Sequence, residues 1–461
     1  MSEEEKRPLI PKEDVELNAT PATARYGICD PTRFLHRILI LALMCFVGFG
    51  KGFCWESPVI LRNPIIEEMG IDEDTFMGLY FWYSWPNIAL CVLGGFLIDR
   101  YIGIRIGAVS LSTVMLLGQW MVALGGYLRV MWLMNAGRFV FGAGCETLSA
   151  VLNTYAVVWF KDSYLNSVLG FQFSVSMIAE IISFNVLLPT YNALGSLYAG
   201  EALGYTLWIA SFPCVLSLIC AMVLASLDLR AENLTNRETH DKSAIHLSDI
   251  FYYPLEIWLI NLISLVVVVS IAAPALVGVL GAYCEYDTLG VLPPFSNFSN
   301  SHPFYIAAAM APFLGYLVDV TGYHLLWLDF AMVFALFGSL VLNFTLISPW
   351  MGTAMISFSY SLLISPLSSI VAFMIPTHKL STAYGLMQAM KALGIAVVTE
   401  ISGIILAFNA FFVVQILFYV GIAVAVMLIV LLDIVNMVTC SRLNISKKER
   451  FSNRLNNVGR A

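Results

Sequence analysis

The chain of 461 residues is 59% hydrophobic and only 12% charged, with a formal net charge of −7 and a mean hydropathy of +0.80. These values exclude an ordinary soluble globular protein and indicate a polytopic membrane protein. The net charge says little about orientation, because acidic residues contribute weakly to it.

Residues 1–33 form a polar tail, which we expect to be cytosolic. Its start, MSEEEKRPLIPKEDVE, is acidic and lacks an apolar core, so no cleavable signal peptide is expected. Glu5 lies four residues before Leu9, which is followed by Ile10, and this spacing fits the acidic dileucine pattern that adaptor proteins bind. We interpret the pattern as a sorting signal; the alternative is a merely solvated tail.

Twelve apolar blocks follow, each near the roughly 20 residues that cross a bilayer core. Because backbone groups in lipid must bond within their own segment, we expect helices. The predicted spans are 34–54, 76–97, 106–126, 131–157, 165–188, 203–226, 255–278, 299–318, 325–346, 352–375, 382–407 and 411–435. The predicted fold is an all-α membrane protein of two six-helix lobes.

A polar connector divides the two sets of spans. The N-terminal lobe is predicted at 34–227, the inter-lobe linker at 228–254, the C-terminal lobe at 255–436 and a basic tail at 437–461. Lys and Arg residues gather on one side of this topology, which makes that side, with both termini, the cytosolic one. The opposite side receives only Arg62 and Arg129.

A short pattern occurs twice, six spans apart. CVLGGFLIDRYIGIR places Gly95 and Asp99 at the end of the second span, and APFLGYLVDVTGYH places Gly315 and Asp319 at the end of the eighth. Such repeats are typical of transporters built from two similar halves. Each glycine permits close helix approach, and each aspartate can meet the positive N-terminus of another helix.

We therefore predict a conformational lock that holds one face of the bundle closed. Its predicted members are Gly95, Asp99, Arg100, Arg105, Asp319 and Arg138, of which Arg138 is interpreted as structural rather than substrate-contacting.

The motif GGFLIDRYIGIR resembles the loop signature of the major facilitator superfamily, and GRFVFGAG resembles its fourth-helix motif. The blocks FWYSWPN, WLMNAGRFVFGAGCE, NTYAVVWFK, SYSLL and STAYGLMQ resemble the lysosomal dipeptide transporter group within that superfamily. The resemblance implies a uniporter that passes small dipeptides out of lysosomes by alternating access. It also implies a glycosylated accessory membrane protein as partner.

Charged residues inside spans are candidates for the substrate path. Burying one near the bilayer centre costs about 2.5–3.5 kcal/mol even on membrane-insertion scales, which give the lowest values. A zwitterionic peptide needs an acid for its amine and a base for its carboxylate. The candidates are Glu146, Lys391, Glu180 and Lys51, together with Tyr80 and Tyr83, which share a helix face. Glu146 is assigned to the amine, as the resemblance also implies.

The carboxylate partner is harder to assign, because Met177 stands where the resemblance implies an arginine. Lys391 is its replacement from the other lobe, a member of a structural ion pair with Glu180, or a solvated lysine. The predicted function is a dipeptide uniporter of the lysosomal membrane. The alternatives are a carrier for amino acids or other small organic ions, and a transport-inactive binding subunit. We expect no enzymatic activity, cofactor, metal or nucleic-acid partner.

Overall fold

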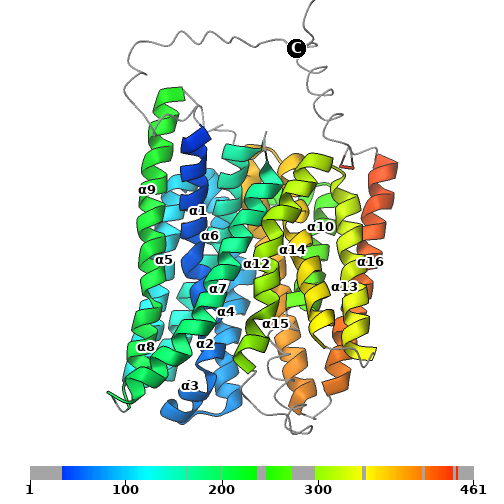
Figure 1. The fold of residues 1–461 in the computed structure, drawn as a ribbon. Helices are drawn as coiled ribbons and strands as arrows, with labels where there is room; N and C mark the ends of the chain where they lie inside the picture. Colours follow the sequence, from blue (N-terminus) through cyan, green and yellow to red (C-terminus); the bar gives the residue numbers. More distant parts are fainter. Residues whose placement is uncertain are drawn as a thin grey trace, which may run out of the picture.

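The computed structural model describes residues 34–161, 164–198, 200–235, 246–272, 296–344, 349–407, 411–439 and 443–444, and these are almost entirely helical. Figure 1 shows long helices packed side by side. In the N-terminal half they are α1 (Phe34–Trp55), α2 (Ser57–Ile60), α3 (Arg62–Met69), α4 (Glu73–Leu97), α5 (Gly103–Leu128), α6 (Met131–Phe160), α7 (Leu165–Gly195), α8 (Ala202–Ala210) and α9 (Phe212–Thr235). In the C-terminal half they are α10 (Leu255–Val267), α12 (Ser296–Thr321), α13 (His324–Phe344), α14 (Pro349–Met374), α15 (Leu380–Ala407) and α16 (Phe411–Thr439).

In the part of the chain that the structure describes, the predicted spans fall mainly on these helices, and the expected all-helical membrane fold is confirmed. Within the described residues, eight helical segments are long and apolar enough to cross a membrane, and one of them covers both α4 and α5. Helices α6 and α15 are not among these segments, and α10 is a shorter apolar helix.

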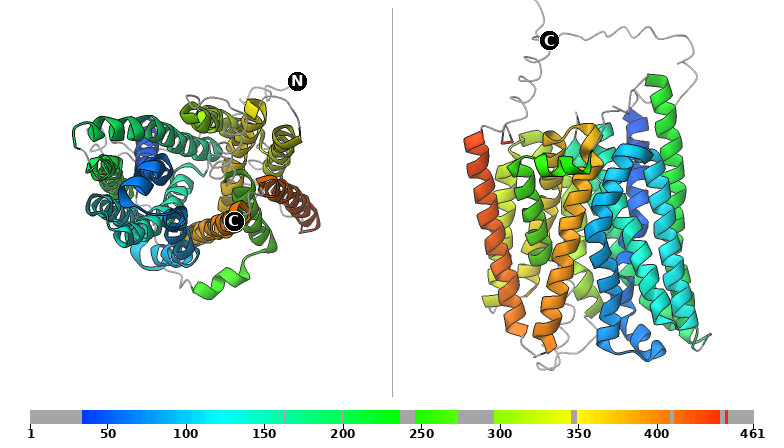
Figure 2. Two further views of the ribbon diagram at one scale, coloured as in Figure 1. Left: turned by 90° about the horizontal axis from the view of Figure 1, so that it is seen from below. Right: turned by 180° about the vertical axis from the view of Figure 1, so that it is seen from behind.

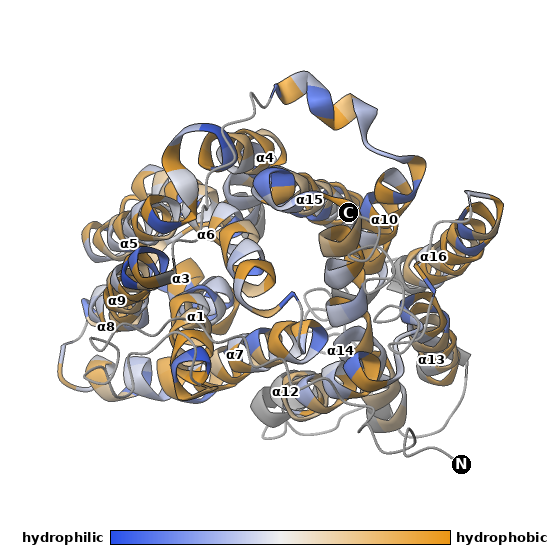
Figure 3. Cartoon of the chain, turned by 90° about the horizontal axis from the view of Figure 1, so that it is seen from above, coloured by the Kyte–Doolittle hydropathy of each residue, from blue (hydrophilic) through white to orange (hydrophobic). Residues whose placement is uncertain are grey.

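Apolar side chains cover the outside of the bundle, and several polar ones lie inside it. Large hydrophobic residues such as Met427 in α16 and Phe313 in α12 are exposed, whereas Arg138, Gln119 and Asn87 are fully buried. In Figure 3 much of each helix ribbon is orange, the colour of hydrophobic residues. This distribution suits a protein whose surroundings are lipid, because only interior polar groups can find partners there.

The sixth predicted span is two helices. Helix α8 ends at Ala210, and α9 starts at Phe212 with Pro213 in its first turn, where a proline costs least. Helix α9 then continues to Thr235, eight residues beyond the predicted end of the lobe at 227.

Two short helices, α2 and α3, connect α1 to α4 and were not expected as separate elements. Pro58 occupies the first turn of α2, and Gly70 ends α3 with a left-handed φ of 62°. Asp72 then caps α4 by accepting a hydrogen bond of 3.1 Å from the Thr75 backbone N–H. In Figure 1 these two helices lie at the lower end of the bundle.

The first residue of α1 and the last residue of α16 lie at the same, upper end (Figure 1). Because Asp99 and Asp319 lie near the ends of helices that finish there, we name it the Asp99 end, and the other the α3 end. Figure 2 shows α1–α9 on one side of the bundle and most of α10–α16 on the other. Contacts between the two sides run mainly through α4 with α15 and α7 with α12.

Candidate substrate site and helix contacts

Two charged residues of the N-terminal half, Lys51 and Glu146, meet in the interior of the bundle. Lys51 Nζ in α1 lies 3.0 Å from Glu146 Oε2 in α6 and donates a 2.8 Å hydrogen bond to Ser149 Oγ. The Lys51 side chain remains 23% exposed and that of Glu146 14% exposed. The ion pair is therefore interior but reachable by solvent, as a solute site must be.

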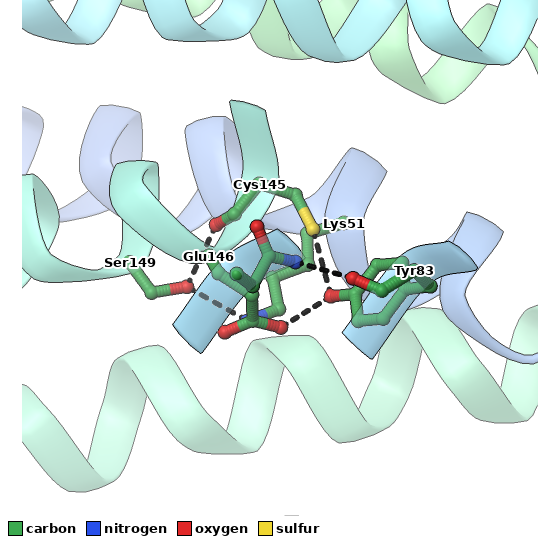
Figure 4. A network of polar contacts seen from close by, with 6 residues as sticks. Lys51, Tyr83, Cys145, Glu146 and Ser149 are labelled. Carbon is green, nitrogen blue, oxygen red and sulfur yellow. Dashed lines mark hydrogen bonds and ion pairs between the residues drawn. The ribbon is translucent and has the colours of Figure 1, made fainter. Parts of the chain in front are cut away.

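Tyr83 in α4 holds the other oxygen of the glutamate. Its hydroxyl donates to Glu146 Oε1, and it lies 3.0 Å from Cys145 Sγ. Figure 4 shows Lys51, Tyr83, Cys145, Glu146 and Ser149 converging from three helices. Since both carboxylate oxygens have a donor, Glu146 is fixed in position and its charge is already balanced by Lys51.

The second predicted tyrosine, Tyr80, lies against a different cation. Arg138 has no exposed surface, and its guanidinium lies 5.6 Å from the ring centre of Tyr80 and 5.0 Å from that of Tyr83. The same guanidinium is 3.5 Å from the Trp55 carbonyl oxygen and interacts electrostatically with buried Glu56. Arg138 thus braces the junction between α1 and α2.

On the facing half, Lys391 in α15 lies on the wall of a cavity of about 10 Å³, together with Tyr360, Ser264 and Ser368. Such a cavity has room for about one water molecule. The charge of Lys391 acts on Glu146 and Lys51 across the interior. The Lys391 side chain itself is half-buried.

Glu180 in α7 is 7% exposed, and in the part of the chain that the structure describes no hydrogen bond or ion pair joins it. It does not pair with Lys391, so the structural ion pair considered above is not formed in this structure. Its electrostatic neighbours are Glu56 and Lys51. Met177, one turn earlier in α7, is buried in a small apolar cluster with Ala307 and therefore offers no charge to a substrate.

Asp99 connects the two halves at the Asp99 end. It lies in a π-helical turn, Ile98–Ile102, directly after α4, and its carboxylate faces the N-terminus of α15. The backbone N–H of Ser381 donates over 3.2 Å, that of Thr382 over 2.6 Å, and the Thr382 hydroxyl over 2.7 Å. These donors are otherwise free at a helix start, and the helix dipole adds to the attraction.

Asp319 repeats this arrangement between α12 and α7. Its carboxylate accepts from the backbone N–H groups of Asn166 and Ser167, over 3.1 and 2.7 Å, and from both of their side chains. The repeat in the sequence therefore corresponds to two equivalent contacts, one at each of the two main boundaries between the halves.

Four glycines allow these helices to touch backbone to backbone. A methyl group on Gly95 would lie 2.3 Å from the Ser381 carbonyl oxygen, and one on Gly385 would lie 2.4 Å from that of Cys91. At the other boundary, Gly315 and Gly170 give equivalent distances of 2.4 Å. No side chain fits at such separations, so the closed arrangement at this end requires glycine.

Arg105, one of the three predicted lock arginines, joins helices within one half. Arg105, in the first turn of α5, pairs with Asp228 and Glu232 of α9, within the N-terminal half. The Arg100 guanidinium lies 5.2 Å from the ring centre of Tyr101. Asp99 and Asp319 therefore carry the contacts across the boundary, while Arg105 holds α5 to α9.

Sequence reasoning did not select Ser149, Tyr360 or Glu56. Ser149 is one helical turn from Glu146, so the turn spacing of α6 could have suggested it. Tyr360 lies in SYSLL, one of the blocks that carry the family resemblance. The neighbouring sequence gives no sign that this tyrosine lines a cavity beside Lys391. The predicted sorting residues Glu5, Leu9 and Ile10 lie outside the described residues.

Comparisons with known proteins agree with this architecture. The family model of the Major Facilitator Superfamily matches residues 38–399. The chain is 40% identical to a zebrafish (Danio rerio) protein named lysosomal dipeptide transporter MFSD1, covering 95% of each chain, and 40% identical to the human protein of that name, covering 92% of this chain and 91% of the relative. The crystal structure of the transporter FucP in the outward conformation superposes with a TM-score of 0.62 at 14% identity, over 86% of this chain and 99% of that one. The chain is therefore a member of the Major Facilitator Superfamily.

Proposed function

We propose that this protein is a dipeptide uniporter of the lysosomal membrane that releases small peptides to the cytosol by alternating access. The observation that carries the proposal is the 40% identity, over 95% of both chains, to a relative named lysosomal dipeptide transporter. The solvent-reachable Lys51–Glu146 pair and the facing Lys391 supply, in one interior, charges that suit both ends of a zwitterion.

In this proposal Glu146 receives the peptide ammonium and Lys391 its carboxylate. Glu146 lies in the N-terminal half and Lys391 in the C-terminal half, so a bound peptide connects the two halves and favours their approach. The contacts of Asp99 and Asp319 close the Asp99 end when the site is exposed at the α3 end. Their release exposes the site at the Asp99 end, which we assign to the cytosol from the distribution of Lys and Arg.

Uptake into proteoliposomes tests this function. The purified full-length protein is reconstituted, and entry of radiolabelled alanyl-alanine is measured against protein-free vesicles and against vesicles given single amino acids. Saturable dipeptide entry that unlabelled dipeptide competes supports the proposal. Entry of amino acids alone would favour the amino-acid carrier, and binding without entry would favour the transport-inactive subunit.

Lys391→Gln is expected to weaken dipeptide binding by about tenfold or more, because the neutral amide removes a charge-assisted contact to the peptide carboxylate. Adding Met177→Arg is expected to restore part of the affinity, since it returns a cation to the same interior from α7. The measurement is the concentration of unlabelled alanyl-alanine that halves labelled uptake. Unchanged affinity in K391Q would leave Lys391 a structural residue.

Location and partner complete the proposal. We propose that Glu5, Leu9 and Ile10 direct the protein to lysosomes and that a glycosylated single-span membrane protein shields it there. The only sequon expected on the lumenal side, Asn297, lies at the start of α12, close to the membrane.

Expression in cultured cells tests both points. The unmodified chain is expected on lysosomal membranes, and its half-life is expected to lengthen when the glycosylated partner is co-expressed. The L9A/I10A double variant is expected at the cell surface instead. If that variant still reaches lysosomes, Leu9 and Ile10 are not the sorting signal. If the half-life is the same with and without the glycosylated partner, that partner does not protect the protein.

A further inference from the structure

We propose that Cys54 and Cys214 are the site of a disulfide bond that joins α1 to α9 within the N-terminal half. Both residues lie toward the α3 end, where α1 leads into α2 and α8 leads into α9 (Figure 1). In the topology proposed above this end faces the lumen of the secretory pathway and lysosome, a compartment in which disulfides form. The bond is a modification of the protein that does not depend on which solute it carries.

The sulfur atoms of these two residues are in contact. Cys54 Sγ lies 3.5 Å from Cys214 Sγ, and neither side chain has exposed surface. Among the cysteines that the structure describes, this is the pair whose sulfur atoms touch; those cysteines, all buried, are Cys45, Cys54, Cys91, Cys145, Cys214 and Cys220. A disulfide needs a sulfur separation of about 2.0 Å, so an approach of roughly 1.5 Å turns the contact into a bond.

The backbone around the pair can supply that approach. Cys54 is the penultimate residue of α1, and Cys214 lies in the first turn of α9, after the break between Ala210 and Phe212. The break leaves the Ala210 carbonyl oxygen to accept a 3.1 Å hydrogen bond from the Cys54 thiol. Residues at helix ends have fewer intrahelical hydrogen bonds than residues in the interior, so they can shift without disturbing the rest of the helix.

Helices α1 and α9 are held together independently of the cysteines. The Gly50 N–H donates a 2.9 Å hydrogen bond to Ser217 Oγ, and that hydroxyl donates over 3.1 Å to the Phe46 carbonyl oxygen. A methyl group on Gly50 would lie 2.9 Å from the Pro213 carbonyl oxygen, so the two backbones touch. A bond between these helices stays within one half and leaves the two halves free to move relative to each other.

Thiol–disulfide exchange with an oxidised protein disulfide forms the bond. The thiolate of one cysteine attacks a sulfur atom of the donor disulfide, which gives a mixed disulfide and releases one donor thiol. The second cysteine attacks the mixed disulfide, forms the Cys54–Cys214 bond and releases the second donor thiol. Two electrons pass to the donor, and the two thiol protons end on its two sulfur atoms. Because both side chains are fully buried in the folded chain, the exchange takes place during membrane insertion, before α1 and α9 pack.

Counting oxidised thiols in the full-length protein, produced in cultured cells and purified without reductant, tests the inference. Free thiols are blocked with N-ethylmaleimide in denaturant, disulfides are then reduced, and the new thiols are labelled with a maleimide-linked polyethylene glycol that shifts the gel band. The wild-type protein is expected to gain at least two labels. Cys54→Ser and Cys214→Ser are each expected to gain two fewer, because the remaining partner is blocked in the first step.

Cys45→Ser and Cys220→Ser are the matched controls, since they remove buried thiols from the same two helices. Both are expected to gain as many labels as the wild-type protein. The melting temperatures of C54S and C214S are expected to lie roughly 5 °C or more below that of the wild-type protein, because the bond closes a long loop.

Mass spectrometry of blocked, unreduced wild-type protein needs no variant. After proteolysis, the peptide that contains Cys54 is expected to be joined to the peptide that contains Cys214, at two hydrogen masses below the sum of the separate peptides. Separate peptides in which both cysteines carry N-ethylmaleimide would overturn the inference. Equal labelling of the wild-type protein, C54S and C214S would overturn it as well.

Discussion

Glu146→Gln is expected to abolish uptake of dipeptides with a free amino terminus. The amide has almost the same volume as the carboxylate, so the helices can keep their packing, but it cannot balance a positive charge. Lys51 Nζ lies 3.0 Å from Glu146 Oε2, and the variant leaves that ammonium without its counter-charge. Lys51 then repels the peptide ammonium that Glu146 would attract.

The expected loss is large because the charges lie in the interior. Truncating one partner of a buried, hydrogen-bonded charge pair in a binding site costs about 2–5 kcal/mol, which corresponds to roughly 30-fold or more in affinity. Initial uptake rates of labelled alanyl-alanine measure the effect, with the amount of monodisperse protein as a check on folding. N-acetylated dipeptides carry no ammonium, so in the wild-type protein they are expected to be taken up more slowly than unmodified dipeptides. In E146Q this difference in uptake rate is expected to disappear.

Glu400→Gln is the matched control. It makes the same chemical change on α15, but Glu400 is exposed, so its charge can be solvated without a protein partner. Uptake in E400Q is expected to stay near the wild-type rate. If E146Q transports normally, or if both variants lose activity to the same degree, the assignment of Glu146 to the peptide ammonium is wrong.

The positions of the spans and the Asp99 contact are features that a sequence can reveal. The length of an apolar segment can be read directly from the sequence. The four-residue separation of Gly95 and Asp99 recurs at Gly315 and Asp319. A carboxylate at a helix end has few possible partners inside a membrane protein apart from a helix N-terminus. The donors themselves, Ser381 and its neighbour, become visible only in the folded chain.

The partners of the interior charges could not be predicted in this way. Lys51 and Glu146 are 95 residues apart, and nothing in their local sequences states that α1 and α6 present them to each other. Cys54 likewise lies 3.5 Å from Cys214 Sγ, a contact between α1 and α9 over 160 residues. For Glu180 the sequence offered a base in Lys391, whereas the packing of α7 and α15 leaves the two unpaired.

Gly95→Ala is expected to reduce transport by at least about fivefold, although it adds a single methyl group. Its Cβ would lie 2.3 Å from the Ser381 carbonyl oxygen and 3.0 Å from the Thr382 Cα, and both are backbone atoms at the start of α15. Backbone cannot rotate away as a side chain can, so α4 and α15 must move apart. Overpacking of this kind costs about 1–3 kcal/mol, or roughly 5- to 150-fold in the population of the closed state.

The displacement also weakens the Asp99 contact, because the Ser381 and Thr382 N–H groups recede from the carboxylate. A carrier that works by alternating access needs both end states, so loss of the closed state at the Asp99 end slows the complete cycle. Gly78→Ala, in the same helix, is the matched control: the nearest atom to its added methyl group is Asn135 Oδ1 at 3.8 Å, an ordinary contact.

Uptake and thiol accessibility together measure the effect of G95A. Thr154 is 2% exposed, and its hydroxyl lies 3.2 Å from that of Ser381 across the boundary. A cysteine placed there by Thr154→Cys is expected to react slowly with a water-soluble thiol reagent, and faster when G95A is added but not when G78A is added. Because the Gly315 boundary has the same geometry, Gly315→Ala should act like G95A. Normal uptake together with unchanged reactivity in G95A would show that backbone contact between α4 and α15 is not required for closure.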